Sequence, residues 1–474
     1  MIQIVSECTR KVSISFFRED DDNLLSLPES IRLLFDGTYL QSVWMPEGQD
    51  RLKLLVGMGK VKEDRIQRKE LAASAVKQCI EKKISEFSMD IGPFLAEEAS
   101  ESVYDIVEGA ILGTYEPGQF QDSGRQHVQL ELSGVPKQVM DDITAAVREM
   151  EAVAEGICFA RDMVNLPGNK LRPEDFACKV IQFIEGTGVE TTVLGAEELR
   201  KLGLNALLGV GESSAYLPCM VILRYCGNPE DSKISGLIGK GVTCDTGGYC
   251  LKPGDSMLGI KGDMAGGAAV AGVVYALARN RIKTNVTAVI PMCENRISPG
   301  SLLPGDVIDS YSGKTIEIAN TDAEGRLILA DAVSYAVRDE GVTEVLDIAT
   351  LTGAVVNMLG FSIGGAICDN NEFYKRFEAA CRISGERYLR LPFYKEHEKM
   401  IESPVADIRN LGEKFCGTIT AGLFIRAFAE EKPWLHLDIA GTAWVDTPVF
   451  AFQSKGATGA GVTSIYQLCS KEEQ

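Results

Sequence analysis

The sequence is short of histidine and of positive charge. Only three histidines, His127, His397 and His436, occur in 474 residues, so we expect neither a metal site nor a catalytic base built mainly from imidazole. The 48 lysines and arginines face 67 aspartates and glutamates, which gives a net charge of −19. That balance disfavours broad binding to a nucleic-acid backbone. It leaves room for metal sites built from carboxylates.

Paired cysteines and long apolar runs are also missing. The 13 cysteines are scattered singly and none forms a C-x-x-C pair, a pattern typical of reduced thiols rather than of a disulfide framework. The first residues, MIQIVSECTRKVSIS, have no basic patch followed by an apolar stretch, so we expect no signal peptide. No apolar run approaches the roughly 18 residues that a membrane span needs. The sequence therefore predicts a cytoplasmic protein with no membrane segment.

The order of apolar and amphipathic segments predicts an α/β fold. Residues 1–135 alternate short apolar runs with amphipathic charged stretches, and a helical pattern follows over about 138–164, ending before Pro167 and Gly168. Beyond it, continuously apolar strand-like runs alternate with helical runs. We predict a smaller N-terminal α/β domain, residues 1–150, with a role in oligomer formation or regulation. A larger C-terminal domain, residues 151–474, should hold a mainly parallel sheet flanked by helices.

The stretch ANTDAEGRLILADA, residues 319–332, places two acids at the start of a helical run that is otherwise almost wholly apolar. Taken alone, Asp322 predicts a helix N-cap. Glu324 alone predicts a first-turn acid that is favoured by the helix dipole. The polar positions of the helix itself, which include Asp331 and Ser334, form a narrow stripe at helical spacing. Most of the helix surface should therefore face protein.

A second cluster of charges lies in residues 237–269. Lys240 sits inside an apolar strand-like run, where a lysine is costly unless a partner holds it. Asp245 follows at the end of that run, Lys252 comes next, and Asp263 precedes a glycine- and alanine-rich helix. Glycine fills 11 of the 37 residues from 236 to 272, a density that favours tight turns and close backbone approach to a ligand over rigid scaffold.

The four acids of these two clusters fall at strand ends or helix starts of one predicted sheet. Brought together, four carboxylates repel one another unless some protonate or cations neutralise them. Two divalent ions would balance four negative charges. Oxygen ligands suit Mg²⁺ or Mn²⁺ and are tolerated by Zn²⁺, and Lys240 would ligate only as the neutral amine. The alternative keeps Lys240 and Asp245 as a structural ion pair and the other acids as helix caps.

These segments resemble the two-metal leucyl aminopeptidase family of cytosolic peptidases. NTDAEGRL, residues 320–327, is similar to the signature of that family, and GKGVTCDTGG (239–248) and KGDMAGGAA (261–269) resemble two further family blocks at matching separations. Weaker likenesses run through ARDMVNLPGN, DIATLTGA and LHLDIAGTAW. The N-terminal third is similar only in places, such as EGAILGTY.

The resemblance implies a metal-dependent aminopeptidase that releases the N-terminal residue of peptides with a free amine. It implies two divalent ions per subunit, Mn²⁺ or Zn²⁺ with Mg²⁺ as a further option, and a bicarbonate that serves as general base. It also implies a homohexamer. Asp245 and Glu324 would bridge the metals, Asp322 would complete a loosely held site, and Lys252 would stabilise the oxyanion. The implied metal ligands are Lys240, Asp245, Asp263, Asp322 and Glu324, and the implied catalytic residues are Lys252 and Arg326, with Arg326 holding the bicarbonate.

The sequence departs from the family pattern at several positions. Cys244 and Cys250 replace a usual Phe and Ser, Ala265 and Gly267 vary a glycine-rich block, and Ile260 stands where Met often lines the pocket for the first side chain of the substrate. No matched ligand is lost, so the predicted activity stands and the preference for leucine stays open. Two rival functions also stay open: a DNA-binding architectural role, which the net charge opposes, and phosphoester hydrolysis at the same metals.

Overall fold

The computed structural model describes residues 2–60, 64–95, 99–117 and 128–471. His127 lies outside these residues. The chain forms two compact units. The first comprises residues 1–154 with 447–454, and the second comprises residues 155–446 with 455–474. The functional roles predicted for residues 1–150 and 151–474 stay predictions. Among the described residues, none of the helices combines the length and apolarity that a membrane crossing requires.

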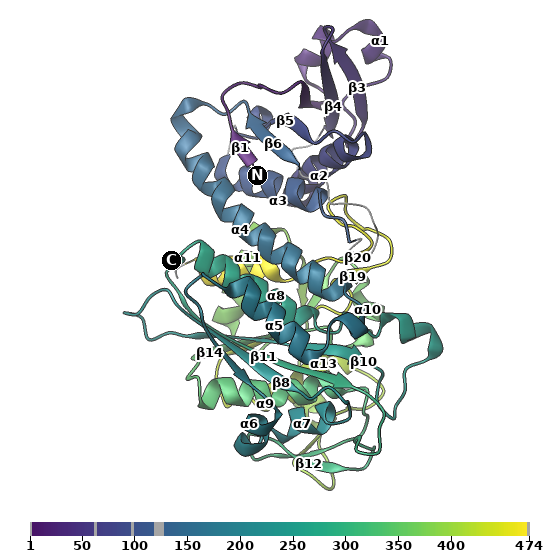
Figure 1. The fold of residues 1–474 in the computed structure, drawn as a ribbon. Helices are drawn as coiled ribbons and strands as arrows, with labels where there is room; N and C mark the ends of the chain where they lie inside the picture. Colours follow the sequence, from purple (N-terminus) through teal and green to yellow (C-terminus); the bar gives the residue numbers. More distant parts are fainter. Residues whose placement is uncertain (1, 61–63, 96–98, 118–127, 472–474) are drawn as a thin grey trace. The chain divides into compact units, whose positions relative to one another are not determined.

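The first unit is a six-stranded sheet with helices packed against it (Figure 1). All its neighbouring strands are parallel except β3 and β4, as βα units predict. Gly109 lets α3 approach α2 closely, because a Cβ there would lie 2.3 Å from the carbonyl oxygen of Lys69. In sheet order the strands are β1 (Ile2–Ile4), β6 (Gln129–Ser133), β5 (Glu86–Asp90), β2 (Val12–Arg18), β4 (Arg51–Gly59) and β3 (Ser42–Glu47); the helices are α1 (Glu29–Arg32), α2 (Arg65–Glu81) and α3 (Ala99–Gly113).

Helix α4, Met140–Asn165, contains the boundary between the two units. It confirms the helix predicted over about 138–164. The chain leaves helical geometry before Pro167, whose backbone is extended (φ −71°, ψ 147°), because a residue that precedes proline disfavours the helical region.

The second unit is built on a nine-stranded sheet whose central pairs, β18–β14, β14–β9, β9–β11 and β10–β11, are parallel. Antiparallel pairs lie toward its two edges. The mainly parallel sheet and its strand-like runs are therefore confirmed. In sheet order the strands are β16 (Tyr388–Arg390), β15 (Gly364–Cys368), β18 (Trp434–Asp438), β14 (Glu344–Ala349), β9 (Ser235–Gly239), β11 (Asn285–Asn295), β8 (Cys219–Cys226) and β7 (Glu190–Leu194), with β10 (Gly241–Asp245) beside β11.

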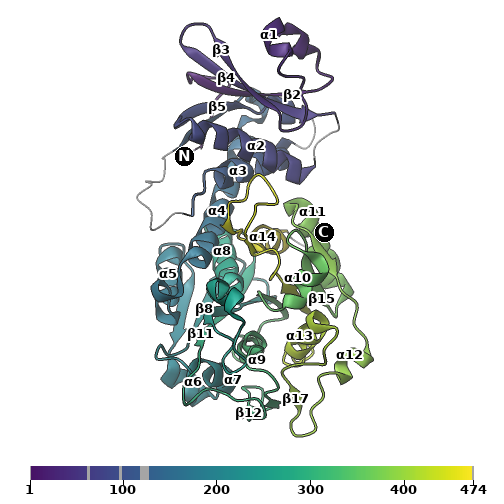
Figure 2. The same ribbon diagram turned by 90° about the vertical axis from the view of Figure 1, so that its right-hand side faces the viewer.

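Helices cover both faces of this sheet, with α5 and α8 on one side and α9 on the other (Figures 1 and 2). The helices of the first face are α5 (Pro173–Ile184), α8 (Ala265–Arg279), α11 (Asn371–Ser384) and α14 (Val462–Ser470), and those of the second are α7 (Asn205–Gly211), α9 (Glu324–Arg338) and α13 (Gly417–Arg426). Smaller elements are α6 (Ala196–Leu202), α10 (Gly353–Leu359), α12 (Lys395–Lys399), β12 (Val307–Asp309), β13 (Thr315–Glu317), β17 (Ile408–Arg409), β19 (Trp444–Val445) and β20 (Gly456–Ala457).

Helix α9 is more deeply buried than its sequence predicts. Asp331 and Ser334, expected in its polar stripe, are both fully buried. The Asp331 carboxylate accepts backbone N–H groups from Ala206, Leu207 and Tyr311 at 2.8–3.0 Å. The interpretation of a polar stripe was wrong at these two positions, because backbone donors of distant segments satisfy the buried carboxylate.

Several glycines between residues 236 and 272 allow close helix packing rather than the approach of a ligand. A Cβ on Gly266 of α8 would lie 2.0 Å from the carbonyl oxygen of Ile348 in β14, and a Cβ on Gly239 would lie 2.2 Å from the Val270 side chain. The prediction that these glycines let the backbone approach a ligand is wrong. They instead let α8 pack closely against the strands. Turn glycines that do border the candidate site are described below.

Substituting Gly266 with alanine should therefore destabilise the second unit. We expect Gly266→Ala to lower the free energy of unfolding by about 1–3 kcal/mol, because the new methyl group has no room beside β14. Gly254→Ala is the matched control, since nothing lies within 4 Å of its ideal Cβ. Urea unfolding of both variants measures the difference, and equal stability would contradict the packing role of Gly266.

Candidate metal centre

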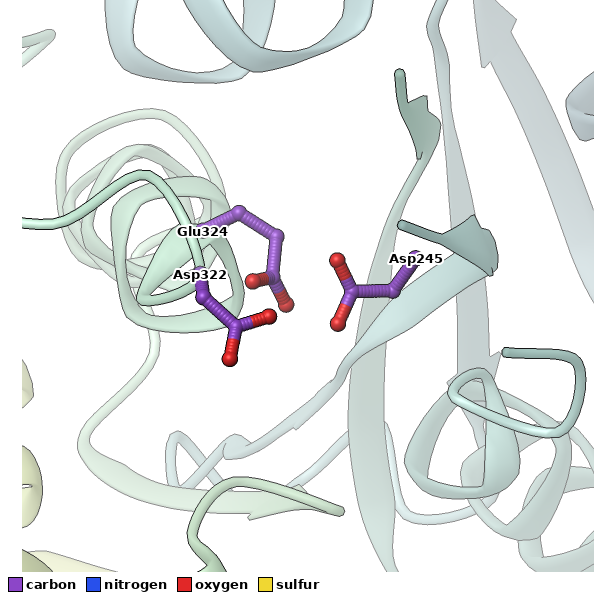
Figure 3. Close-up of side chains that lie close together, drawn as sticks. All are labelled: Asp245, Asp322 and Glu324. Atoms are coloured by element: carbon purple, nitrogen blue, oxygen red, sulfur yellow. The ribbon is translucent and has the colours of Figure 1, made fainter. Parts of the chain in front are cut away.

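Three carboxylates from separate segments face one another in the second unit (Figure 3). Asp245 is the last residue of β10, Glu324 is the first residue of α9, and Asp322 lies in the turn before that helix. One oxygen from each lies within 4.8 Å of the others. Asp245 and Glu324 are buried, whereas Asp322 is exposed. Since β9, β10, β11, β14 and β18 run parallel, their carboxyl ends meet at one edge of the sheet, where ligands bind in such folds.

The predicted residues Lys240 and Asp263 lie beside the same carboxylates. Lys240 is buried, and its Nζ lies 2.7 Å from Asp263 Oδ2, 2.9 Å from Glu324 Oε1 and 3.0 Å from the carbonyl oxygen of Thr350. Thr350 also donates its hydroxyl to Asp263 Oδ1 at 2.7 Å. Burial lowers the pKa of Lys240, but the neighbouring carboxylates outweigh it and raise that pKa above its usual range.

Lys252 lies on the more open side of the carboxylates. Its Nζ is 2.7 Å from Asp245 Oδ2 and 2.5 Å from Asp322 Oδ1. Burial lowers the pKa of Lys252, but the carboxylate charges of Asp245 and Glu324 raise it more. The four acids are thus paired directly with two lysines.

The carboxylate charge of the site is only partly compensated. Burial, reinforced by the charge of Asp245, raises the pKa of Glu324 to about 8. Burial likewise raises the pKa of Asp263 despite the opposing effect of Lys240. Glu324 Oε2 is buried and accepts no hydrogen bond from the described residues. Such an unpartnered oxygen, in a set of carboxylates and one amine, fits a divalent cation of the Mg²⁺, Mn²⁺ or Zn²⁺ kind.

A glycine turn after β10 brings Asp245 and Asp322 together. Gly247 has a positive φ of 86°, and a Cβ on it would lie 2.9 Å from Asp322 Oδ1. Its N–H donates to Asp245 Oδ1 at 3.0 Å, and Asn295 Nδ2 donates to the same oxygen at 2.9 Å. This glycine is therefore required by both the turn conformation and the approach of the second carboxylate.

Gly325 leaves the space that the side chain of Lys240 occupies at the site. A Cβ at Gly325 would lie 2.5 Å from Lys240 Cε and 2.6 Å from its Nζ. The second residue of α9 must therefore lack a side chain if Lys240 is to reach Glu324 and Asp263. This contact supplies a physical reason for glycine in the stretch NTDAEGRL.

The start of α9 differs from one prediction. Its N-cap is Ala323, and no side chain caps the helix. The interpretation of Asp322 as the N-cap is wrong, because its carboxylate instead accepts from Lys252. Its backbone N–H is bound by Asn320 Oδ1 at 2.7 Å. The prediction that Glu324 lies in the first turn is confirmed.

Arg326 lies deeper in α9 and is buried. Its Nη1 donates to the carbonyl oxygen of Asn410 at 2.8 Å, whereas its Nε has no hydrogen-bond acceptor among the described residues. Burial lowers the pKa of Arg326 to about 10, against the raising effect of Glu324. The guanidinium therefore remains charged at neutral pH and keeps a donor for an anion.

One cavity of about 380 Å³ gathers every residue that the sequence proposed for the site. A neighbouring cavity of about 250 Å³ shares Asp245, Lys252 and Asp263 with it and is otherwise more apolar. The residues of the first cavity include Lys240, Asp245, Lys252, Asp263, Asp322, Glu324 and Arg326. The apolar wall of the second includes Ile260, Ala440, Ala443 and Trp444.

Three supporting residues were not singled out from the sequence: Asn295, Thr350 and Asn410. Asn295 contacts Asp245 and the carbonyl oxygen of Thr321, at 3.0 Å for the latter. Thr350 falls within DIATLTGA, and the likeness of that segment to the family could have identified it. Asn295 and Asn410 are uncharged and lie far from the acids in sequence, so the sequence offers no such signal for them. His436 is fully buried, with its Nδ1 2.5 Å from Asp347 Oδ1.

Comparisons with known proteins agree with this architecture. Two family descriptions match the chain: "Cytosol aminopeptidase family, catalytic domain" over residues 158–466, and its N-terminal domain over residues 46–123. A protein named "Probable cytosol aminopeptidase" from Treponema denticola is 38% identical over 449 residues, which cover 93% of each chain. One of the same name from Clostridium perfringens is 40% identical over 372 residues, 77% of this chain and 75% of that one.

Solved structures show the same fold over nearly the whole chain. The bottromycin maturation enzyme BotP has a TM-score of 0.88 at 32% identity, covering 97% of this chain and 98% of its own. A structure of BotP in complex with Mn has a TM-score of 0.86 at 32% identity, covering 97% and 99%. With both family domains matched and one relative aligned over 93% of each chain, the chain belongs to the cytosol aminopeptidase family of metal-dependent peptidases.

Proposed function

We propose that this protein releases the N-terminal residue of peptides at a centre of two divalent ions. The observation that carries the proposal is the convergence of carboxylates from β10 and α9 within 4.8 Å of one another. In the proposal Asp245, Glu324 and Asp322 would hold the ions together with Asp263 and Lys240, which lie beside them. Mn²⁺ or Zn²⁺ are the proposed metals, with Mg²⁺ as a further option.

Lys240 requires a change of protonation to act as a ligand. Lys240 lies in ion pairs with Asp263 and Glu324, which favour the charged ammonium. Dications at these carboxylates would remove that effect and favour the neutral amine. Metal binding at this centre should therefore release protons.

Different side chains of the site would have different roles in the reaction. When bound, the two ions supply Lewis acidity and lower the pKa of a shared water. Lys252, whose side chain is more exposed than that of Lys240, would stabilise negative charge that develops on the scissile carbonyl oxygen. Arg326 would use its unpartnered Nε to hold a bicarbonate, which supplies the general base. His436 is unsuited to that role because it is buried against Asp347.

The apolar cavity beside the carboxylates is proposed as the site of the first side chain of the substrate. Its wall includes Ile260, Ala440 and Trp444, which suit an aliphatic group. A free N-terminal amine next to the metals would explain removal of single residues from the chain end. From the family resemblance alone, we also propose a homohexamer, a cytoplasmic location and a role of the N-terminal domain in assembly or regulation.

Removing the carboxylate of Glu324 tests the site. Glu324→Ala should lower kcat/KM for an amino-acyl amide on the order of 1,000-fold, because it removes a proposed metal ligand. Glu344→Gln is the matched control: this buried glutamate begins β14, at the opposite end of the strand from the site, and pairs with Arg376. Wild-type turnover by Glu324→Ala would reject the assignment. A phosphate ester in the same assay tests phosphoester hydrolysis.

Stripping the metals should abolish activity reversibly. After exhaustive chelation the protein should release no amino acid, and Mn²⁺ or Zn²⁺ should restore turnover. The stripped protein should also melt at a lower temperature, because a ligand that binds only the folded state stabilises it. Full activity in protein shown by elemental analysis to be free of metal would contradict the two-metal mechanism.

Enlarging the apolar cavity should change substrate preference. Ile260→Ala should raise the ratio of kcat/KM for phenylalanine amide over leucine amide about tenfold, because the shortened wall leaves space for the larger ring. Leu258→Ala, which alters a 92% exposed neighbour, is the control. An unchanged ratio in Ile260→Ala would show that another surface selects the first residue.

A further inference from the structure

Asn410 is a buried asparagine next to the turn that carries Asp322. It follows β17, a two-residue strand that pairs in parallel with β13, so that Glu317 lies opposite Arg409. The Asn410 N–H donates to the carbonyl oxygen of Glu317 at 3.0 Å. This pairing aligns Asn410 with the segment that leaves β13 and leads into α9. The side chain of Asn410 is fully buried there.

The amide of Asn410 binds the backbone at both ends of this turn. Its Oδ1 accepts the N–H groups of Ala319 at 2.8 Å and Asn320 at 3.2 Å. Its Nδ2 donates to the carbonyl oxygens of Asn320 at 2.7 Å and Ala323 at 3.4 Å. One side chain thus fixes the two residues before Thr321 and the residue after Asp322.

The same residue also holds the anion-binding arginine. The carbonyl oxygen of Asn410 accepts from Arg326 Nη1 at 2.8 Å. Asn410 therefore contacts both the backbone on either side of Asp322 and the side chain of Arg326. Asn295 also binds the carbonyl oxygen of Thr321, so two asparagines contact the backbone of the turn.

Other contacts hold the middle of the turn: the Thr321 hydroxyl donates to the carbonyl oxygen of Gly247 at 2.7 Å and accepts the Cys250 N–H at 2.8 Å, and Asn320 Oδ1 accepts the Asp322 N–H at 2.7 Å. The Asn410 amide binds the backbone of residues 319, 320 and 323. Among the described residues, no side chain caps helix α9 at its N-cap Ala323, and the exposed carboxylate of Asp322 is bound only by Lys252. Without the Asn410 amide, two N–H groups and two carbonyl oxygens lose a buried partner. The turn would then have to rearrange to satisfy them, and the position of Asp322 would change.

We propose that Asn410 is a positioning residue of the metal centre, which holds the 319–323 turn so that Asp322 reaches the metal while Arg326 stays beside it. The proposal rests on the function proposed above. It makes Asn410 a determinant of metal affinity, since partners that orient ligands typically change affinity by about 10-fold to 100-fold when removed.

The test compares metal binding and stability in the full-length protein. Stripped wild type, Asn410→Ala and a control are titrated with MnCl₂ by calorimetry, and their melting temperatures are measured without metal. The control is Asn285→Ala. Asn285 is also a buried asparagine with four hydrogen bonds to loop backbone, at residues 228, 231 and 233, but it lies at the end of β11 remote from Asn295.

Asn410→Ala should weaken the more weakly bound Mn²⁺ about 10-fold to 100-fold, whereas Asn285→Ala should lower the melting temperature and keep wild-type affinity. Wild-type affinity for both ions in Asn410→Ala would overturn the inference. If that variant does not fold, Asn410→Asp replaces it, because this change keeps an acceptor for Ala319 and Asn320 but loses the Nδ2 donor. Weakened Mn²⁺ binding by Asn410→Asp would then support the inference, and wild-type affinity for both ions would overturn it. Absence of binding of Mn²⁺, Zn²⁺ and Mg²⁺ by wild type would instead refute the proposed function itself.

Discussion

The structure depends on a concentration of negative charge at the edge of a parallel sheet. Two like charges about 4 Å apart repel by roughly 4 kcal/mol at an effective dielectric constant of 20, and this site gathers four carboxylates, two of them buried. Lys240 and Lys252 each lie between two of these acids. Glu324 still keeps an unpartnered buried oxygen and a raised pKa. A site with these properties is stabilised by cations.

The rest of the second unit serves to hold these charges in place. Strand β10 is buried and ends at Asp245, and α9 is buried along nearly all of its length, so Glu324 starts from a rigid support. Close contacts that require glycine then set the distances: Gly266 seats α8 on β14, and Gly325 admits the Lys240 side chain. Asn295 and Asn410 bind backbone carbonyl oxygens of the turn before α9.

Much of this arrangement follows from local sequence. Continuous apolar runs predicted the central strands, and the change to helical spacing predicted α8 and α9. The resemblance of three short segments proposed the site residues, and the structure places all of them around one cavity. Local sequence does not show which distant residues each side chain will contact in the fold. Asp322 has the sequence of an N-cap but pairs with Lys252, and Asp331 has the spacing of a surface acid but binds distant backbone. Asn410 gains its role only because β17 pairs with β13.

Crystals of the protein grown with Mn²⁺ offer the most direct measurement, through anomalous scattering recorded on both sides of the manganese absorption edge. The account predicts two anomalous peaks about 3.5–4 Å apart, with carboxylate oxygens of Asp245 and Glu324 between them and Lys240 Nζ within ligand distance of one. A map without peaks at these carboxylates, or with manganese bound only elsewhere on the surface, would contradict the two-metal centre.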